Sequence, residues 1–262
     1  MDIGLINLSG YMDVFVLILI RVTALFIISP IFARKSVPNI LKIGFAMLVA
    51  LIIMPMMDMS TATKDRTVLQ YALLVFNEFS IGVILGFVSY MAFSALYIAG
   101  QMIDMQIGFG IVSVIDPQSN IQIPVIANFY YIIAMLMFLN LNGHHILISS
   151  IFYSYKVLPI GTAMVSNILI NDIVRMFSDM FIIGFKIAAP IVAATFVTNV
   201  ALGILARTVP QMNIFIVGMP LKIAVGLATL MLVIPMFSII MDVIVNGMSR
   251  DLKTVLEGMI IR

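Results

Sequence analysis

The 262-residue sequence contains no cysteine and no tryptophan. Without cysteine, the chain can form no disulfide bond, no thiolate metal site and no cysteine nucleophile. Without tryptophan, an aromatic belt at a membrane interface would depend on the eight tyrosines. These absences exclude disulfide-stapled and thiol-based proteins before any motif is considered.

Charged residues are also scarce, at 10% of the sequence, whereas 63% of the residues are hydrophobic and the mean hydropathy is +1.19. An ordinary soluble domain has about 45–50% apolar and about 25% charged residues, so the composition indicates an integral membrane protein. The net charge of +2 is too small to suggest a nucleic-acid partner. Asp2 and Asp13 are atypical of the basic start of a signal peptide, so we expect the N-terminal segment to be retained.

Apolar runs alternate with breaks that contain polar residues or proline. A helix that spans a bilayer needs about 20 residues, and several of the runs are shorter or longer than this. The runs cover residues 14–31, 43–57, 68–98, 125–141, 146–158, 173–200 and 214–245. We predict an all-α membrane protein of long, bent helical hairpins that forms a single domain over residues 1–262.

Several ionisable residues lie inside apolar runs, where a charge is costly and usually faces a partner or a pathway. Asp13 and Arg21 are about two helical turns apart, so they share a helix face without necessarily touching. Arg175 and Asp179 have the spacing of an ion pair on one helix, with a contact to another subunit as the alternative. The stretch between residues 67 and 155 has no Lys or Arg but contains Glu78, Asp104 and Asp116.

Catalytic motifs are not evident. The two histidines, His144 and His145, are neighbours, and adjacent residues on a helix point in different directions instead of converging on a metal. The sequence has no HExxH motif, no Gly-x-Ser-x-Gly elbow and no phosphate-binding loop with lysine. We interpret Asn142-Gly143 as a turn before the next helix, and we expect no enzymatic activity, no metal and no cofactor.

The segment GFGIVSVIDPQSNIQIP, at residues 108–124, is polar and helix-breaking although it lies in an apolar chain. A backbone that breaks at membrane depth is tolerated only where protein or a water-filled passage covers its polar groups. The segment is therefore predicted either to surface as a loop or to line a passage. Met102 and Met105 precede it, and because methionine adapts to irregular shapes, they are candidates either for lining the passage or for ordinary packing.

The C-terminal residues 249–262 read SRDLKTVLEGMIIR and predict an amphipathic tail. Ser249 is available as an N-cap. Apolar residues then recur at helical spacing, at Leu252, Val255, Leu256, Met259 and Ile260. Such a tail is expected either to dock on a partner or to lie on the membrane.

Four segments together resemble the FliR family of flagellar export-gate proteins, which includes a component of virulence type III secretion systems. They are SPIFARKSVP near the N-terminus, GQMIDMQIGFGIVSVIDPQSNIQIP, NGHHILI, and LGILARTVPQMNIFIVGMPLKI. Each is modestly specific alone, whereas their order and spacing are highly specific. The resemblance covers essentially the whole chain.

The resemblance implies a heteromeric export gate in the bacterial inner membrane, within the flagellar basal body. FliP and FliQ would be membrane partners, FlhB would pack on the cytoplasmic side, and unfolded flagellar subunits would pass through the centre. The region 108–122 would form a pore plug, with its residues Gly108, Phe109, Gly110, Ile111, Val112, Val114, Ile115, Asp116, Pro117, Gln118, Ser119 and Asn120. Candidates for packing between subunits are Arg207, Pro210, Gln211, Asn213 and Lys222.

Three alternatives stay open at this point. A virulence-associated export gate would share the same motifs. A secondary transporter also uses broken helices and polar residues at mid-membrane depth, but it would act alone and bind a small ligand. A purely structural scaffold would tolerate rewriting of residues 108–122.

Overall fold

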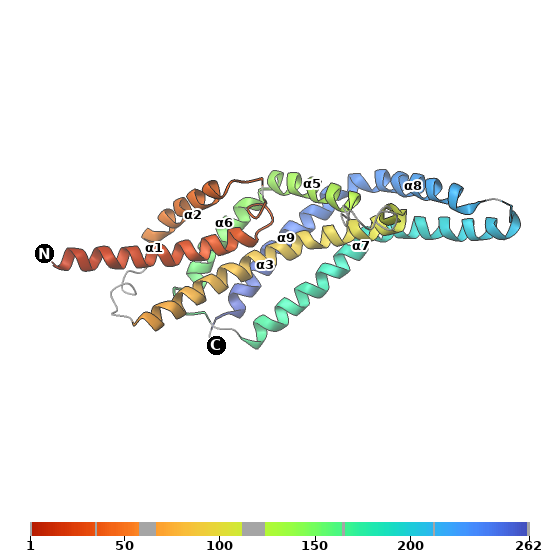
Figure 1. Cartoon of the computed structure of the whole chain (residues 1–262). Helices are drawn as coiled ribbons and strands as arrows, with labels where there is room; N and C mark the ends of the chain where they lie inside the picture. Colours follow the sequence, from red (N-terminus) through yellow and green to blue (C-terminus); the bar gives the residue numbers. More distant parts are fainter. Residues whose placement is uncertain are drawn as a thin grey trace. The chain divides into compact units, whose positions relative to one another are not determined.

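The computed structural model describes residues 2–34, 36–57, 67–111, 124–163, 166–211 and 213–260, and within them the regular secondary structure is entirely helical. Figure 1 shows the order of the helices along the chain. The α-helices are α1 (Asp2–Ile28), α2 (Asn39–Ile53), α3 (Val68–Ile107), α5 (Val125–Asn140), α6 (Gly143–Val157), α7 (Asn167–Thr208), α8 (Ile214–Val233) and α9 (Phe237–Gly258). Three short 3₁₀ helices are η1 (Met54–Met56), η3 (Phe109–Ile111) and η4 (Ile234–Met236). The predicted all-α fold class is confirmed.

Five helical segments of the described chain are long and apolar enough to cross a membrane. They are Gly10–Ile28, Asn39–Met56, Val68–Ile107, Asn167–Thr208 and Ile214–Gly258, and a sixth span would arise from α5 and α6 together. With 40 and 42 residues, α3 and α7 are each about 60 Å long, about twice the thickness of bilayer hydrocarbon. The expected long spans are therefore confirmed.

Prolines and a left-handed asparagine mark the breaks between helices. Asn142, between α5 and α6, has a φ of 55° in the left-handed region, which confirms the predicted turn at Asn142-Gly143. Pro235 lies in η4, between α8 and α9, so the apolar run 214–245 forms two helices where the sequence predicted one. Pro190 and Pro220 lie inside α7 and α8 without ending them.

The chain divides into two compact units. Unit 1 comprises Met1–Met91, Asn142–Met176 and Asn246–Arg262, and unit 2 comprises Ala92–Leu141 and Phe177–Val245. The helices α3, α7 and α9 each contribute residues to both units. The expectation of a single domain over residues 1–262 stays a prediction.

In unit 1, two glycines of α3 allow its backbone to approach α1. A Cβ at Gly82 would collide with the carbonyl oxygen of Arg21, and a Cβ at Gly86 would lie 2.9 Å from the Cβ of Ile28. The later glycine of α3 contacts a later residue of α1, so α1 and the first half of α3 run parallel at this point. The glycines thereby bring the interior of α3 within reach of the Arg21 side chain.

A buried ion pair joins these two helices to a third part of unit 1. Nε of Arg21 donates to Oε2 of Glu78 at 2.7 Å, and both side chains are fully buried. The Arg21 guanidinium also donates to Oγ of Ser154 in α6 and to the carbonyl oxygen of Leu158. Glu78 in turn accepts a hydrogen bond from the backbone N–H of Gly161. The network thus connects α1, α3, α6 and the turn that follows α6.

Two sequence-based expectations, the ion pair between Arg175 and Asp179 and the helix start at Ser249, were wrong. Arg175 pairs with Asp172, at 3.6 Å, instead of with Asp179. Ser249 lies inside α9 and does not start a helix, because α9 runs without interruption from Phe237 to Gly258. Four residues of the tail's apolar face, Leu252, Val255, Leu256 and Met259, are buried, whereas Ile260 is 42% exposed.

Aromatic contacts hold the centre of unit 2 together. The ring of Phe93 in α3 meets the ring of Phe138 in α5 edge to face, with the centroids 5.1 Å apart. Tyr130 of α5 packs against Phe237 at the start of α9, at 5.2 Å. All four residues are buried, with exposed fractions below 4%. This core positions the end of α3 beside α5.

Candidate functional site

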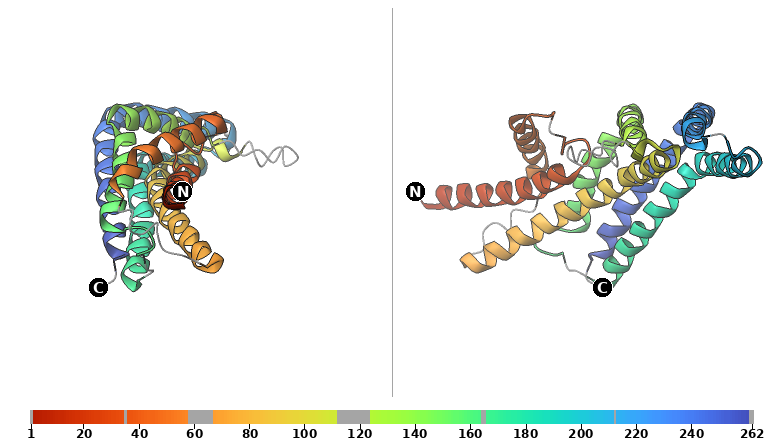
Figure 2. Two further views of the ribbon diagram at one scale, coloured as in Figure 1. Left: turned by 90° about the vertical axis from the view of Figure 1, so that its left-hand side faces the viewer. Right: turned by 45° about the vertical axis from the view of Figure 1, so that its right-hand side comes forward.

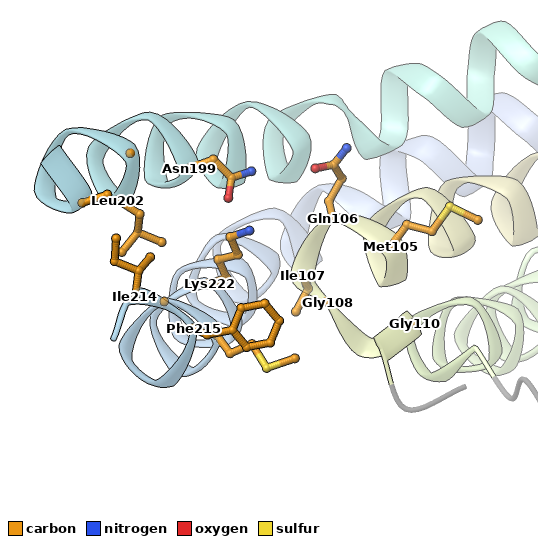
Figure 3. A pocket seen from close by; sticks show the side chains of 14 residues that line it. Met105, Gln106, Ile107, Gly108, Gly110, Asn199, Leu202, Ile214, Phe215 and Lys222 are labelled. Atoms are coloured by element: carbon orange, nitrogen blue, oxygen red, sulfur yellow. The ribbon is translucent and has the colours of Figure 1, made fainter. Parts of the chain in front are cut away.

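A cavity of about 540 Å³ lies in unit 2 (Figure 3), lined by the C-terminal end of α3 and by the hairpin formed by α7 and α8. Its walls are largely apolar, and three separate parts of the sequence form them. The lining residues are Met105, Gln106, Ile107, Gly108, Gly110, Asn199, Leu202, Gly203, Ala206, Ile214, Phe215, Gly218, Met219 and Lys222. The cavity therefore unites two regions that the sequence singled out separately, around residues 105–110 and 213–222.

Three polar side chains occur among these apolar walls. In Figure 3, Asn199 points from α7 toward the side of Lys222 in α8, and Gln106 extends from the end of α3 toward α7. The Oδ1 atom of Asn199 is buried and accepts no hydrogen bond from the described residues. A buried polar atom left unpaired costs about 1–3 kcal/mol. Asn199 thus contributes to the cavity wall and holds a buried acceptor without a partner among the described residues.

Asp104 links the end of α3 to the start of α5. Its two carboxylate oxygens accept hydrogen bonds from the backbone N–H groups of Ile126, at 2.9 Å, and Ala127, at 3.2 Å. These are the second and third residues of α5, whose own N-cap, Pro124, offers no side-chain acceptor. Asp104 therefore caps α5 from another helix, and a carboxylate at that position is also favoured by the helix dipole.

The same contact brings the backbones of α3 and α5 together. A Cβ at Gly100 would collide with the Cα of Ala127 and would lie 2.6 Å from its nitrogen. Gly100, one helical turn before Asp104, is therefore needed for α5 to start close enough to be capped. Together, Gly100 and Asp104 hold the start of α5 against the last turns of α3.

The structure places only the first part of the predicted plug. Gly108 has a φ of 101°, a conformation that favours glycine, and Phe109, Gly110 and Ile111 form η3. Val112, Val114, Ile115, Asp116, Pro117, Gln118, Ser119 and Asn120 lie outside the described residues. The assignment of the plug stays a prediction.

The two methionine candidates differ in their surroundings. The Met105 side chain is 75% exposed and lines the cavity. Met102 is half-buried and is not among the residues that line it. Met105 therefore faces a space that another molecule can enter, whereas Met102 contributes more to packing.

The predicted subunit-packing residues occupy the tip and one side of the α7–α8 hairpin. Arg207 is exposed in the last turn of α7, and Pro210 and Gln211 are exposed in the turn that follows. Asn213 caps α8 by accepting from the N–H groups of its second and third residues. Lys222 lines the cavity, whereas the other four residues of this set are not among the cavity-lining residues.

Asn199 was not singled out from the sequence, and the role of Asp104 was not recognised. The sequence did offer a signal for Asn199. It lies inside the apolar run 173–200, and a polar amide inside a membrane helix needs a partner. For Asp104, the indication was a carboxylate just before a segment that ends in proline at the start of a helix.

The chemistry of the site is that of a binding surface. Within the described residues, no group of three or more His, Cys, Asp or Glu side chains is placed to hold a metal ion. The His144 and His145 rings contact each other edge to face, with centroids 4.3 Å apart, at the start of α6 in unit 1. The cavity offers apolar area, one free acceptor and one lysine, which suits a protein segment of complementary shape.

Comparison with known proteins identifies the family. The family model of bacterial export proteins, family 1, matches residues 12–248. The flagellar biosynthetic protein FliR of Bacillus subtilis (strain 168) is 41% identical over 243 residues, which cover 92% of each chain. Proteins of the same name are 33% identical in Escherichia coli (strain K12), over 84% of each chain, and 34% identical in Pectobacterium carotovorum subsp. carotovorum, over 83% of this chain and 82% of the relative. The resemblance drawn from the sequence motifs is confirmed, and the chain belongs to the bacterial export proteins, family 1.

Proposed function

We propose that the chain is a membrane component of the flagellar protein export apparatus and forms part of its closed gate. The reported relatives are named flagellar biosynthetic proteins, so the virulence-associated alternative and the secondary transporter receive no support from them. The chain is proposed to act by assembling with partners and to have no enzymatic activity. The membrane in question is proposed to be the bacterial inner membrane, at the flagellar basal body.

The cavity beside residues 108–110 is the observation that carries this proposal. It opens at the start of the segment proposed as the plug, and Asn199 lines it with an unpaired buried acceptor. A neighbouring subunit that fills the cavity with apolar side chains and donates one hydrogen bond would remove that cost. We propose FliP and FliQ as the neighbours, FlhB as a further partner on the cytoplasmic side, and unfolded flagellar subunits as the molecules in transit.

The exposed apolar area supports assembly. In the most apolar 18-residue window of Ile214–Gly258, only 17% of the residues are buried, compared with 56% for α3. Phe215 and Ile216, at the start of α8, are 72% and 70% exposed. Lipid covers part of such a surface, and subunits of a heteromeric gate are proposed to cover the rest.

The plug is tested by deleting residues 111–120 in cells that produce all other components of the apparatus. We expect small ions to leak across the inner membrane, because the proposed hydrophobic seal excludes water from the closed pore. Co-purification with FliP and FliQ shows whether the gate still assembles. A second variant that keeps the chain length, with Ile111, Val112, Val114 and Ile115 replaced by serine, covers the case in which the deletion prevents assembly.

The control is the same deletion in cells that lack FliP, where no pore forms and no leak is expected. Unchanged permeability in an assembled gate would show that residues 111–120 are not a plug. A leak that persists without FliP would show that the chain conducts ions alone, as a transporter or channel would.

A further inference from the structure

A groove in unit 1 lies between α6 and the last turns of α9, and neither the family nor the proposed gate accounts for it. Its volume is about 370 Å³. Figure 2 shows α6 and the end of α9 side by side. The hydroxyl of Tyr153 in α6 donates to Oε1 of Glu257 in α9, at 3.3 Å, and so ties the two walls together.

The floor of the groove is apolar. Leu252 and Leu256 of α9 are buried at its base, and Ile146 and Phe152 of α6 are partly exposed along its side. The hydroxyls of Ser149 and Ser150 also line it, but they donate to carbonyl oxygens of their own helix. The hydroxyl donors of these two serines are therefore already used within α6.

Two lysines, one from each wall, give the groove a positive charge. Lys156 lies in the last turn of α6, and Lys253 lies in the last two turns of α9. Both are exposed, and neither forms an ion pair with any part of the chain that the structure describes. The carboxylate of Glu257, four residues after Lys253 in α9, accepts a hydrogen bond from Tyr153. A ligand in the groove thus meets two free ammonium groups above an apolar floor.

We propose that this groove binds an anionic phospholipid of the phosphatidylglycerol type, with its phosphate between Lys156 and Lys253 and an acyl chain along the apolar floor. Lysines near the ends of membrane helices reach toward the headgroup region, and basic pockets between such helices bind anionic headgroups. A helix of a partner protein is the competing occupant. The two lysines favour an anionic headgroup over such a helix, and the experiment below distinguishes the two.

The test uses the full chain, co-produced with the other apparatus proteins and purified in mild detergent. The protein is delipidated and titrated with phosphatidylglycerol or with phosphatidylcholine of the same acyl chains, and native mass spectrometry counts the retained lipid. We expect retention of phosphatidylglycerol and a loss of affinity of roughly fivefold for each lysine removed in Lys156→Gln, Lys253→Gln and the double variant. Lys186→Gln, which removes an exposed lysine of α7 outside the groove, is the matched control and should bind normally.

The variant Lys156→Arg/Lys253→Arg keeps both charges and should retain the lipid, which separates a charge effect from a folding defect. Equal retention of the two lipids, or unchanged retention of phosphatidylglycerol by the double glutamine variant, would overturn the proposal. A photo-crosslinking residue in place of Phe152 adds a direct observation. It should capture lipid, and capture of an apparatus protein at this position would assign the groove to a protein partner instead.

Discussion

Arg21 and Glu78 lie 57 positions apart in the sequence and form a fully buried ion pair, with Nε of Arg21 2.7 Å from Oε2 of Glu78. The Tyr155 ring stacks on the guanidinium, whose central carbon lies 3.8 Å from the ring centroid. The positive charge is thereby surrounded by a carboxylate, an aromatic face, a hydroxyl and a carbonyl oxygen. Such complete pairing is what allows two charges to be removed from solvent.

Removing one partner of this pair should destabilise unit 1 strongly. We expect Arg21→Met or Glu78→Met alone to cost about 3–5 kcal/mol, because the remaining group is left buried without its partner. The double variant Arg21→Met/Glu78→Met should recover most of the loss. Thermal unfolding of the purified chain in detergent, followed by size-exclusion chromatography, measures this. Additive losses in the double variant would contradict a direct pairing.

Asp104 should matter for the start of α5 more than for α3, in which it lies. Asp104→Ala leaves the N–H groups of Ile126 and Ala127 without their acceptors, and we expect a loss of about 1–3 kcal/mol. Asp104→Asn keeps one acceptor oxygen and should lose less. Hydrogen exchange at the first turn of α5 reports the local effect. Asp13→Asn, at an exposed position of α1, is the control and should change stability by less than about 0.5 kcal/mol.

Gly100→Ala should separate α3 from α5. The added Cβ would collide with the backbone of Ala127, which cannot move without breaking the hydrogen bonds to Asp104. We expect a lower melting temperature and faster hydrogen exchange at the start of α5. Gly44→Ala is the matched control, since a Cβ there meets no atom within 4 Å and alanine favours a helix by up to about 1 kcal/mol. Equal behaviour of the two variants would show that the close approach is unimportant.

Asn199→Leu should have opposite effects on the isolated chain and on the working apparatus. In the isolated chain, it removes an unpaired buried acceptor, so its stability should stay unchanged or rise. In the assembled apparatus, a partner's donor would lose its acceptor, and we expect reduced export, measured as smaller swimming halos. Asn171→Leu, at an exposed position of the same helix, is the control. Normal swimming with Asn199→Leu would show that no partner bonds to this amide.

The lengths of the helices could be predicted where an apolar run covered the whole helix. They were underestimated where the helix continued through polar residues. The sequence ended one helix at residue 98, whereas α3 continues to Ile107 through Gln101 and Asp104. Asp104 is tolerated there because it is paired with backbone groups of α5, and that pairing depends on tertiary structure. Likewise, α7 extends beyond the predicted block 173–200 at both ends, to Asn167 and Thr208.

The partners of buried charges could not be read from local spacing. Arg21 was compared with Asp13 on its own helix, but Asp13 is exposed and Glu78 of another helix is the partner. A stretch from residue 67 to residue 155 without Lys or Arg nevertheless contains Glu78, so its cation had to come from elsewhere in the chain. The sequence therefore indicates that a distant pair exists but does not identify its members.

The candidate site was predicted in parts. Glycine at position 108 and the polar break after it follow from backbone and hydropathy arguments, and Gly108 does adopt a positive φ. The cavity itself depends on bringing the α7–α8 hairpin to the end of α3, which no sequence pattern specified. The C-terminal tail shows the converse, since its helical periodicity was correct but most of its apolar face packs inside the protein.

The length of α3 and α7 has a consequence for the cell. Helices of 40 and 42 residues cannot be covered by one thickness of hydrocarbon, so an unassembled copy exposes apolar surface to the aqueous phase. Quality-control proteases remove chains in such a state, and losses of stability of about 1–2 kcal/mol change abundance several-fold. The amount of this protein should therefore follow the supply of its neighbours, and surplus synthesis of this chain alone should shorten its lifetime without raising the number of complete assemblies.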